Sequence, residues 1–115
     1  MPLSVPELVQ QAAGGIRRLD AQTALAEYQE KQGLIIDVRE PGEVSQLPTP
    51  GTINIPRGVL EMKITELCPN EEAAIYIHCA SGGRATLAAE QLKRLGYTDV
   101  TAIACTAQEL CQLMD

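Results

Sequence analysis

The sequence contains no Phe and no Trp, and its three Tyr are the only aromatic residues. A hydrophobic core must therefore be built from Leu, Ile, Val and Ala. The lack of aromatic rings also removes the stacking surfaces on which single-stranded nucleic acid binders hold bases. Basic residues are few as well: nine Lys and Arg stand against fifteen Asp and Glu, which gives a net charge of −6. This charge argues against nucleic acid or an anionic membrane as the main partner.

Long hydrophobic segments are also missing. No run approaches the roughly 20 apolar residues that a membrane-spanning helix needs, and the N-terminus lacks the basic and apolar regions of a secretory signal. We therefore expect a cytoplasmic protein, whose four Cys are free or catalytic rather than bridged in that reducing compartment. With a single His and no C-x-x-C pair, the sequence predicts no metal site, and we expect no cofactor.

What is present fits one ordinary domain: 115 residues, 45% hydrophobic and 21% charged. Short apolar runs alternate with helical patterns, which is typical of an α/β domain with a mainly parallel sheet. Strands are expected over residues 15–19, 34–38, 52–55, 73–78 and 100–104. Helices are expected over residues 21–31, 59–67, 85–95 and 107–114. Residues 1–14 are expected to form a loosely attached N-terminal extension, and residues 15–115 the domain itself.

Local signals predict where several elements begin and end. Asp20 is a good N-cap for the first of these helices, Gly33 is expected to stop it, and Gly96 is expected to end the helix over 85–95. Thr106 and Glu109 have the spacing of a capping box. The segment 41–51 is rich in Pro and Gly and is expected to remain a loop.

The most informative segment follows the strand over 73–78 and reads Cys79-Ala80-Ser81-Gly82-Gly83-Arg84. Because the carboxyl ends of parallel strands face the ligand crevice, Cys79 should lie at the functional edge of the sheet. The two glycines let the backbone N–H groups curl inward, while a helix N-terminus and the Arg84 charge add positive potential. Such a setting favours a nucleophilic thiolate. The alternative is a buried structural Cys beside a tight turn.

Three stretches together resemble the rhodanese family of single-domain thiosulfate sulfurtransferases: LIIDVRE at 34–40, PGTINIP at 50–56 and IYIHCASGGR at 75–84. The resemblance covers most of the chain and implies a three-layer α/β fold with a five-stranded, mainly parallel sheet flanked by helices. It also implies a two-step mechanism. Cys79 would take the sulfane sulfur of thiosulfate or a persulfide donor, and would then pass it to a thiol or cyanide acceptor.

The resemblance also assigns roles to neighbouring residues. The loop N–H groups of Ala80, Ser81, Gly82, Gly83 and Arg84 would hold the persulfide and the departing anion. Asp37 and Arg39 would support the edge of the active site through ion pairs, with Glu43 as a natural partner for Arg39.

Two other functions stay open. One is a persulfide carrier that holds sulfur for a partner protein. The partner would be the protein sulfur acceptor, and turnover without it would be low. The other is a phosphatase. Tyrosine-type phosphatases place five residues between Cys and Arg, whereas this chain places four between Cys79 and Arg84. The tighter loop suits a single sulfur atom better than a phosphate group.

The remaining Cys differ in their settings. Where the family typically has a glycine pair followed by a Trp-bearing helix, this chain has Ala104-Cys105-Thr106. We predict that Cys105 ends the last strand close enough to Cys79 to resolve its persulfide as a disulfide, the alternative being a small buried residue. Neither Cys68 nor Cys111 has an activating environment. An anionic donor also needs a positive mouth in this acidic chain, for which the candidates are Arg84, Arg57 and Lys63.

Overall fold

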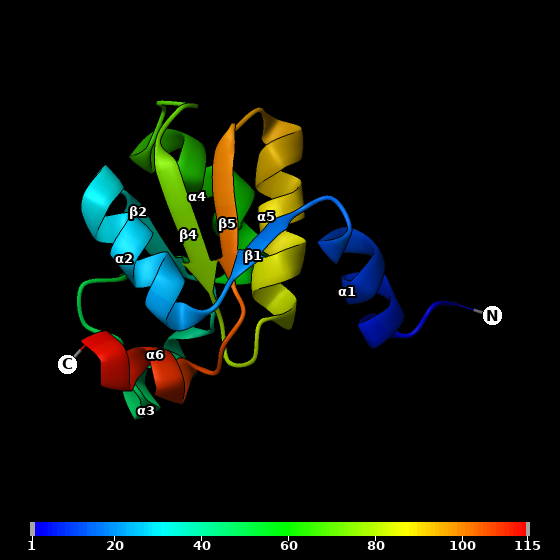
Figure 1. Cartoon of the computed structure of the whole chain (residues 1–115). Coiled ribbons are helices and arrows are strands. Elements are labelled where there is room, and N and C mark those ends of the chain that lie inside the picture. Colours follow the sequence, from blue (N-terminus) through cyan, green and yellow to red (C-terminus); the bar gives the residue numbers. More distant parts are fainter. Residues whose placement is uncertain (1, 115) are drawn as a thin grey trace.

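The computed structural model describes residues 2–114 and has a five-stranded sheet at its centre (Figure 1). The strands are β1 (Arg17–Leu19), β2 (Leu34–Asp37), β3 (Ile53–Asn54), β4 (Ala74–His78) and β5 (Asp99–Ile103). Their order in the sheet is β1-β5-β4-β2-β3, and each neighbouring pair is parallel. The predicted fold class and the five predicted strands are confirmed.

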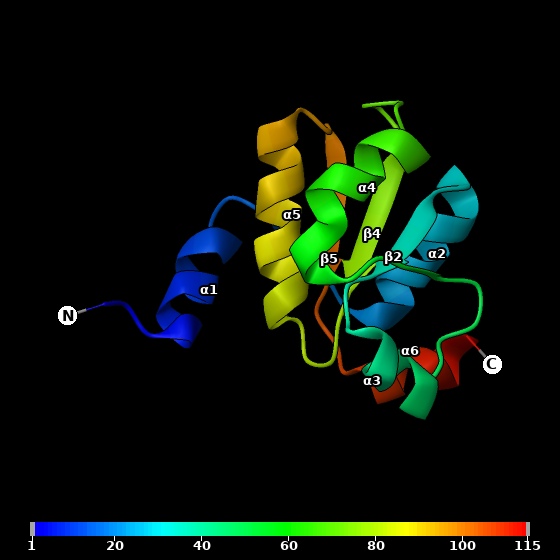
Figure 2. The same cartoon turned by 180° about the vertical axis from the view of Figure 1, so that it is seen from behind.

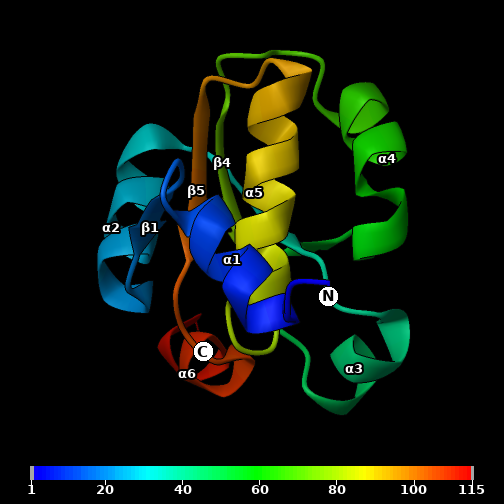
Figure 3. The same cartoon turned by 90° about the vertical axis from the view of Figure 1, so that its right-hand side faces the viewer.

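Helices cover both faces of the sheet (Figures 2 and 3). They are α1 (Val5–Ala13), α2 (Ala21–Lys31), α3 (Pro41–Gln46), α4 (Leu60–Leu67), α5 (Gly83–Leu95) and α6 (Ala107–Met114), with a short 3-10 helix over Arg57–Val59 before α4. Helices α4 and α5 lie on one face, and α2 lies on the other. Helices α3 and α6 lie beyond the carboxyl ends of the strands, where the expected site should be.

The central strand β4 shows how the sequence builds two cores. All five of its residues are buried, and successive side chains of a strand point to opposite faces. Ile75 and Ile77 therefore join the cluster under α4 and α5, together with Leu60 and Leu92. Tyr76 joins the cluster on the α2 face, which gives three layers around one sheet.

The segment 41–51 is not the plain loop that its Pro and Gly content predicts. Its first part forms α3, because Pro41 fits the first turn of a helix. The Glu43 carboxylate also accepts the N–H of Glu40 at 3.0 Å, which satisfies a free donor at the helix start. Helix α3 carries Glu43 towards Arg84, in the first turn of α5.

Helix α2 ends at Lys31, close to the expected stop at Gly33, but Gly33 is not the residue that ends it. The residue with left-handed backbone is Gln32, at φ 53°. Gly33 is required by a close approach instead: a Cβ there would lie 2.5 Å from the carbonyl oxygen of Ala74 on β4. The N-cap prediction for α2 is confirmed, because Asp20 accepts the N–H of Thr23 at 2.8 Å.

This close approach gives a stability prediction. Gly33→Ala should lower the free energy of unfolding by about 2 kcal/mol, because overpacking forces the backbones of β2 and β4 apart. The matched control is Gly42→Ala in α3, where a Cβ would meet no described atom within 4 Å; it should stabilise the protein by about 0.5 kcal/mol. Urea unfolding measures both, and equal effects would contradict the assigned contact.

The N-terminal segment forms a defined helix. Ser4 caps α1 in a capping box with Glu7, and Ala12 is buried. The helix lies against α5 on the outside of the sheet (Figure 3). The division into an extension over 1–14 and a domain over 15–115 stays a prediction.

Candidate active site

The Cys79 sulfur lies inside a closed loop between β4 and α5. The residue is 1% exposed. Its Sγ accepts the backbone N–H of Gly82 at 3.1 Å and that of Ala85 at 3.3 Å. Two N–H donors and the N-terminus of a 13-residue helix thus converge on one sulfur, an arrangement that favours negative charge there.

The loop closes in this way because α5 has no capping side chain of its own. Its N-cap is Gly82, with φ 100°, a conformation that residues with a Cβ rarely adopt. The third helical N–H, that of Ala85, would ordinarily bond to the side chain of a Ser or Asp N-cap. Here the Cys79 sulfur takes that place. The hydroxyl of Thr86 donates to the Gly82 carbonyl at 2.7 Å and fixes the turn.

The structure distributes the predicted loop residues unequally. Gly82 is buried and contacts the sulfur, whereas Ser81 is exposed at the surface. The carbonyl of Ala80 accepts the N–H of Ala107 at 3.0 Å, which attaches the loop to α6. Sequence reasoning missed Ala85, one residue beyond the predicted set; counting three positions from a glycine N-cap could have found it.

Arg84 is paired with an acidic residue of α3. Its two terminal nitrogens donate to the Glu43 carboxylate at 2.6 Å and 2.8 Å. The same hydrogen bonds lower the pKa of Glu43 to about 2 and raise the pKa of Arg84. The Arg84 charge is therefore compensated, and its main role here is to hold α3 against the loop. Arg57, the second candidate for a positive mouth, pairs with Glu61 at 2.8 Å, and Lys63 lies on α4 beside Ile53.

The Glu43–Arg84 pair predicts a pH-dependent contribution to stability. Because the folded-state pKa of Glu43 lies below its ordinary 4.5, the pair stabilises the protein fully above that pH and is lost as the pH falls towards 2. Both side chains are more than a third exposed, so the contribution is at most about 1 kcal/mol. Urea unfolding of the wild type and Glu43→Gln should differ near neutral pH and converge in acid. A constant difference across this range would contradict the pairing.

A buried polar cluster supports the strand ends beside the loop. The Arg39 guanidinium bonds to both Asp37 carboxylate oxygens, at 2.8 Å and 3.1 Å, and to the Leu47 carbonyl at 2.8 Å. The expected pairing of Arg39 with Glu43 is wrong: Arg39 meets only the backbone carbonyl of that residue, at 3.5 Å. The Glu43 carboxylate is turned to Arg84.

Two more residues complete this cluster. The Thr49 hydroxyl lies 3.3 Å from an Asp37 oxygen and 3.3 Å from His78 Nε2, and sequence reasoning missed it because it stands in the segment expected to be loop. Burial lowers the pKa of His78, which favours the neutral form of its imidazole. His78 Nε2 faces Asp37 and Thr49, which favours a structural role over general-base catalysis at Cys79.

Cys105 and Cys79 pack into different clusters. Cys79 belongs to the cluster under α4 and α5, whereas Cys105 belongs to the one on the α2 and α6 face. Burial raises the pKa of the Cys105 thiol to about 11, and negative charge on Glu109 and on Cys79 adds to this shift. A protonated thiol is a weak nucleophile. Both observations favour a packing role, and the resolving role of Cys105 stays a prediction.

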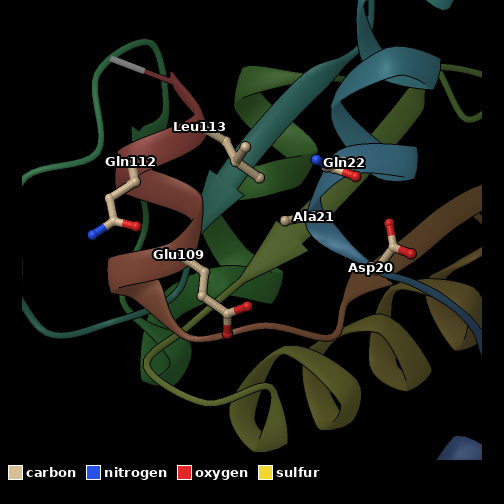
Figure 4. Close-up of a pocket in the computed structure, with 6 residues that line it drawn as sticks. All are labelled: Asp20, Ala21, Gln22, Glu109, Gln112 and Leu113. Atoms are coloured by element: carbon tan, nitrogen blue, oxygen red, sulfur yellow. The ribbon is translucent and has the colours of Figure 1, made fainter.

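A separate hollow of about 440 Å³ lies between α2 and α6 (Figure 4). The carboxylates of Asp20 and Glu109 point into it. Both already accept hydrogen bonds at helix starts, Asp20 from the N–H of Thr23 and Glu109 from the N–H and hydroxyl of Thr106. Two negative charges oppose an anionic sulfur donor, so this hollow does not fit as the donor site.

The described residues also hold few other candidate sites. Across residues 2–114 there is no group of three or more His, Cys, Asp or Glu that could ligate a metal. None of the helices described above is long and apolar enough to cross a membrane.

Comparisons with known proteins found a matching family model and several similar sequences and structures. The family model for the rhodanese-like domain matches residues 20–106. The protein YrkF of Bacillus subtilis, to which the role of a sulfur carrier is provisionally given, is 42% identical over 66 residues. This match covers 57% of this chain and 35% of that protein. The mitochondrial thiosulfate sulfurtransferase RDL2 of Saccharomyces cerevisiae is 34% identical over 94 residues, covering 71% of this chain and 62% of that protein. The chain thus spans less than two thirds of these relatives' lengths.

A solved structure from Rhodopseudomonas palustris matches nearly the whole fold. It covers 98% of this chain and 96% of its own, with a TM-score of 0.79 and 25% identity. That protein is of unknown function, and tyrosine phosphatase activity has been suggested for it. The structural match supports the fold.

Proposed function

Because the chain belongs to the family of rhodanese-like domains, whose relatives here include sulfurtransferases and a provisional sulfur carrier, we propose that it transfers sulfane sulfur through a persulfide on Cys79. The donor is thiosulfate or a persulfide, and the acceptor is a thiol, with cyanide as its laboratory substitute. The observation that carries this proposal is the enclosed Cys79 sulfur, which two backbone N–H groups contact.

The first step is a displacement at sulfur. The Cys79 thiolate attacks the outer sulfur of thiosulfate, a new S–S bond forms, and the old S–S bond breaks with its electron pair leaving on sulfite. In the second step the acceptor thiolate attacks the outer persulfide sulfur, and Cys79 departs as a thiolate. Negative charge rests on sulfur throughout, so the same N–H donors serve both steps. One such preorganised donor can contribute about 3 kcal/mol to a transition state.

The residues around the sulfur receive matching roles in this proposal. The segment Ala80–Arg84 binds the persulfide and the departing anion, with Ala85 as an added donor. Asp37 and Arg39 are positioning residues that fix the neighbouring strand end. The proposed setting is the reducing cytoplasm, which agrees with four free Cys.

A phosphatase reaction is less well supported by the loop. Phosphate binding in such an enzyme would need the Arg84 guanidinium, which already bonds to Glu43 through two nitrogens. The loop also places four residues between Cys79 and Arg84, one fewer than the loop of tyrosine-type phosphatases.

Intact mass spectrometry after thiosulfate treatment tests the proposal. We expect the protein to gain the mass of one sulfur atom and to lose it on adding cyanide. Rapid discharge to thiols indicates a sulfurtransferase. Stable loading with slow discharge indicates a persulfide carrier for a partner protein, the second candidate that the Bacillus subtilis relative favours. No loading, with turnover of an aryl phosphate, would contradict both.

A further inference from the structure

A groove beside the Cys79 loop is lined mainly by residues that precede the segment matched by the family model. Its apolar wall comes from Val5, Val9 and Ala13 on α1. Arg18 on β1 and the loop residues Ser81 and Gly83 complete it. Its volume is about 430 Å³, which lies in the range of small-molecule sites. The figures show α1 lying beside the N-terminal half of α5, where this loop ends (Figures 1 and 3).

The groove adjoins the loop that holds the sulfur, because Ser81 and Gly83 line it. The Val9 side chain lies 3.8 Å from the position that a Cβ on Gly83 would take. The Arg18 guanidinium lies 3.7 Å from the corresponding position on Gly82. Gly82 is thus near both the Arg18 guanidinium and the Cys79 sulfur, whose Sγ accepts its N–H at 3.1 Å.

Arg18 gives the groove a positive charge of its own. The charges of Arg84 and Arg57 are paired with Glu43 and Glu61. Arg18 is exposed and forms no salt bridge with any residue in the range 2–114. In a chain with a net charge of −6, an uncompensated cation next to an apolar wall selects for a ligand that is both anionic and apolar.

We propose that this groove binds the sulfur acceptor, and that the acceptor is a low-molecular-weight thiol joining an apolar segment to an anionic group. The inference rests on the proposed sulfur transfer and adds the class of acceptor. The apolar segment lies along Val9, the anionic group pairs with Arg18, and the thiolate attacks the outer sulfur of the Cys79 persulfide. The new S–S bond forms as the old one breaks, so the acceptor leaves as a persulfide and Cys79 as a thiolate.

Single-turnover discharge of the sulfur-loaded protein tests this with three thiols. Mercaptohexanoate has the chain and the charge, mercaptohexanol has the chain alone, and β-mercaptoethanol has neither. The wild type should discharge fastest to mercaptohexanoate and slowest to β-mercaptoethanol. Arg18→Gln should lower the rate ratio of mercaptohexanoate to mercaptohexanol about threefold, as expected for an exposed charge pair. Val9→Ala should lower the ratio of mercaptohexanol to β-mercaptoethanol about threefold.

Matched controls change the same residue types away from the groove. Arg94→Gln alters an arginine at the far end of α5, and Leu8→Ala alters an exposed apolar residue on α1. Both ratios should stay at their wild-type values. Equal rate ratios in the wild type, or equal losses in groove and control variants, would contradict acceptor binding in the groove. Neither result would affect sulfur loading, so the proposed function would stand.

A binding measurement separates the two proposals fully, because it needs no sulfur chemistry. Hexanoate has the chain and the charge but no thiol. It should shift the amide NMR signals of Val9 and Ser81 in the unloaded wild type, and much less in Arg18→Gln. Such shifts in a protein that fails to load sulfur would contradict the proposed function alone. Absence of these shifts would contradict ligand binding in the groove.

Discussion

Replacing Cys79 by Ser should abolish sulfur loading from thiosulfate and lower turnover by at least about a thousandfold. A hydroxyl is a weak nucleophile without an adjacent general base. The one His of the chain does not supply it, because His78 is buried and its Nε2 faces Asp37 and Thr49. The loop itself should survive the change, since a serine oxygen can still accept the N–H of Ala85.

The control for this prediction is Cys111→Ser. Cys111 lies on α6 and donates to the Pro48 carbonyl, a contact that a hydroxyl can keep. Its turnover should match that of the wild type within a factor of about two. Steady-state kinetics with thiosulfate and cyanide, together with thermal unfolding of both variants, measure the effect. A Cys79→Ser variant that folds and still turns over would refute the assigned nucleophile.

Removing the Arg39 side chain should have the largest effect on stability. The Asp37 and Arg39 side chains are 0% and 3% exposed, so Arg39→Ala leaves a buried carboxylate without its partner. The expected loss in the free energy of unfolding is about 3–5 kcal/mol, which is a large part of the stability of an ordinary domain. The reason is the cost of an unpaired buried charge.

Two further variants keep this prediction decisive. Arg57→Ala removes an arginine from a partly exposed pair with Glu61 and should cost no more than about 1 kcal/mol. Arg39→Lys keeps the charge but loses the fork that bonds both Asp37 oxygens, and should lie between the wild type and Arg39→Ala. Urea unfolding ranks all three. Similar losses for Arg39→Ala and Arg57→Ala would contradict the buried pair.

Most of the fold could be predicted because local sequence and tertiary structure agree. Buried parallel strands give continuous apolar runs, as in Ala74–His78, and Asp20 marks the first residue before α2. Helix α3 could not be predicted in this way. Its start depends on the hydrogen bond from the Glu40 N–H to the Glu43 carboxylate. In the sequence these two glutamates stand among prolines and glycines, which predict a loop.

The site was predictable to the extent that it is local. The segment around Cys79 contains its own turn and its own N–H donors. The partners of its charged residues depend on long-range packing instead: Glu43 meets Arg84 only because α3 folds back across the sheet end. Arg18 lies beside the loop because β1 pairs with β5 across most of the chain length.

The central claim is that Cys79, and no other Cys, carries the transferred sulfur. Peptide sequencing by mass spectrometry of the thiosulfate-treated protein tests it most directly. Trypsin should release residues 64–84, with Cys68 and Cys79, and residues 95–115, with Cys105 and Cys111. The account predicts the extra sulfur on Cys79 alone, and its loss after cyanide. Extra sulfur on Cys68, Cys105 or Cys111, with Cys79 unmodified, would contradict it.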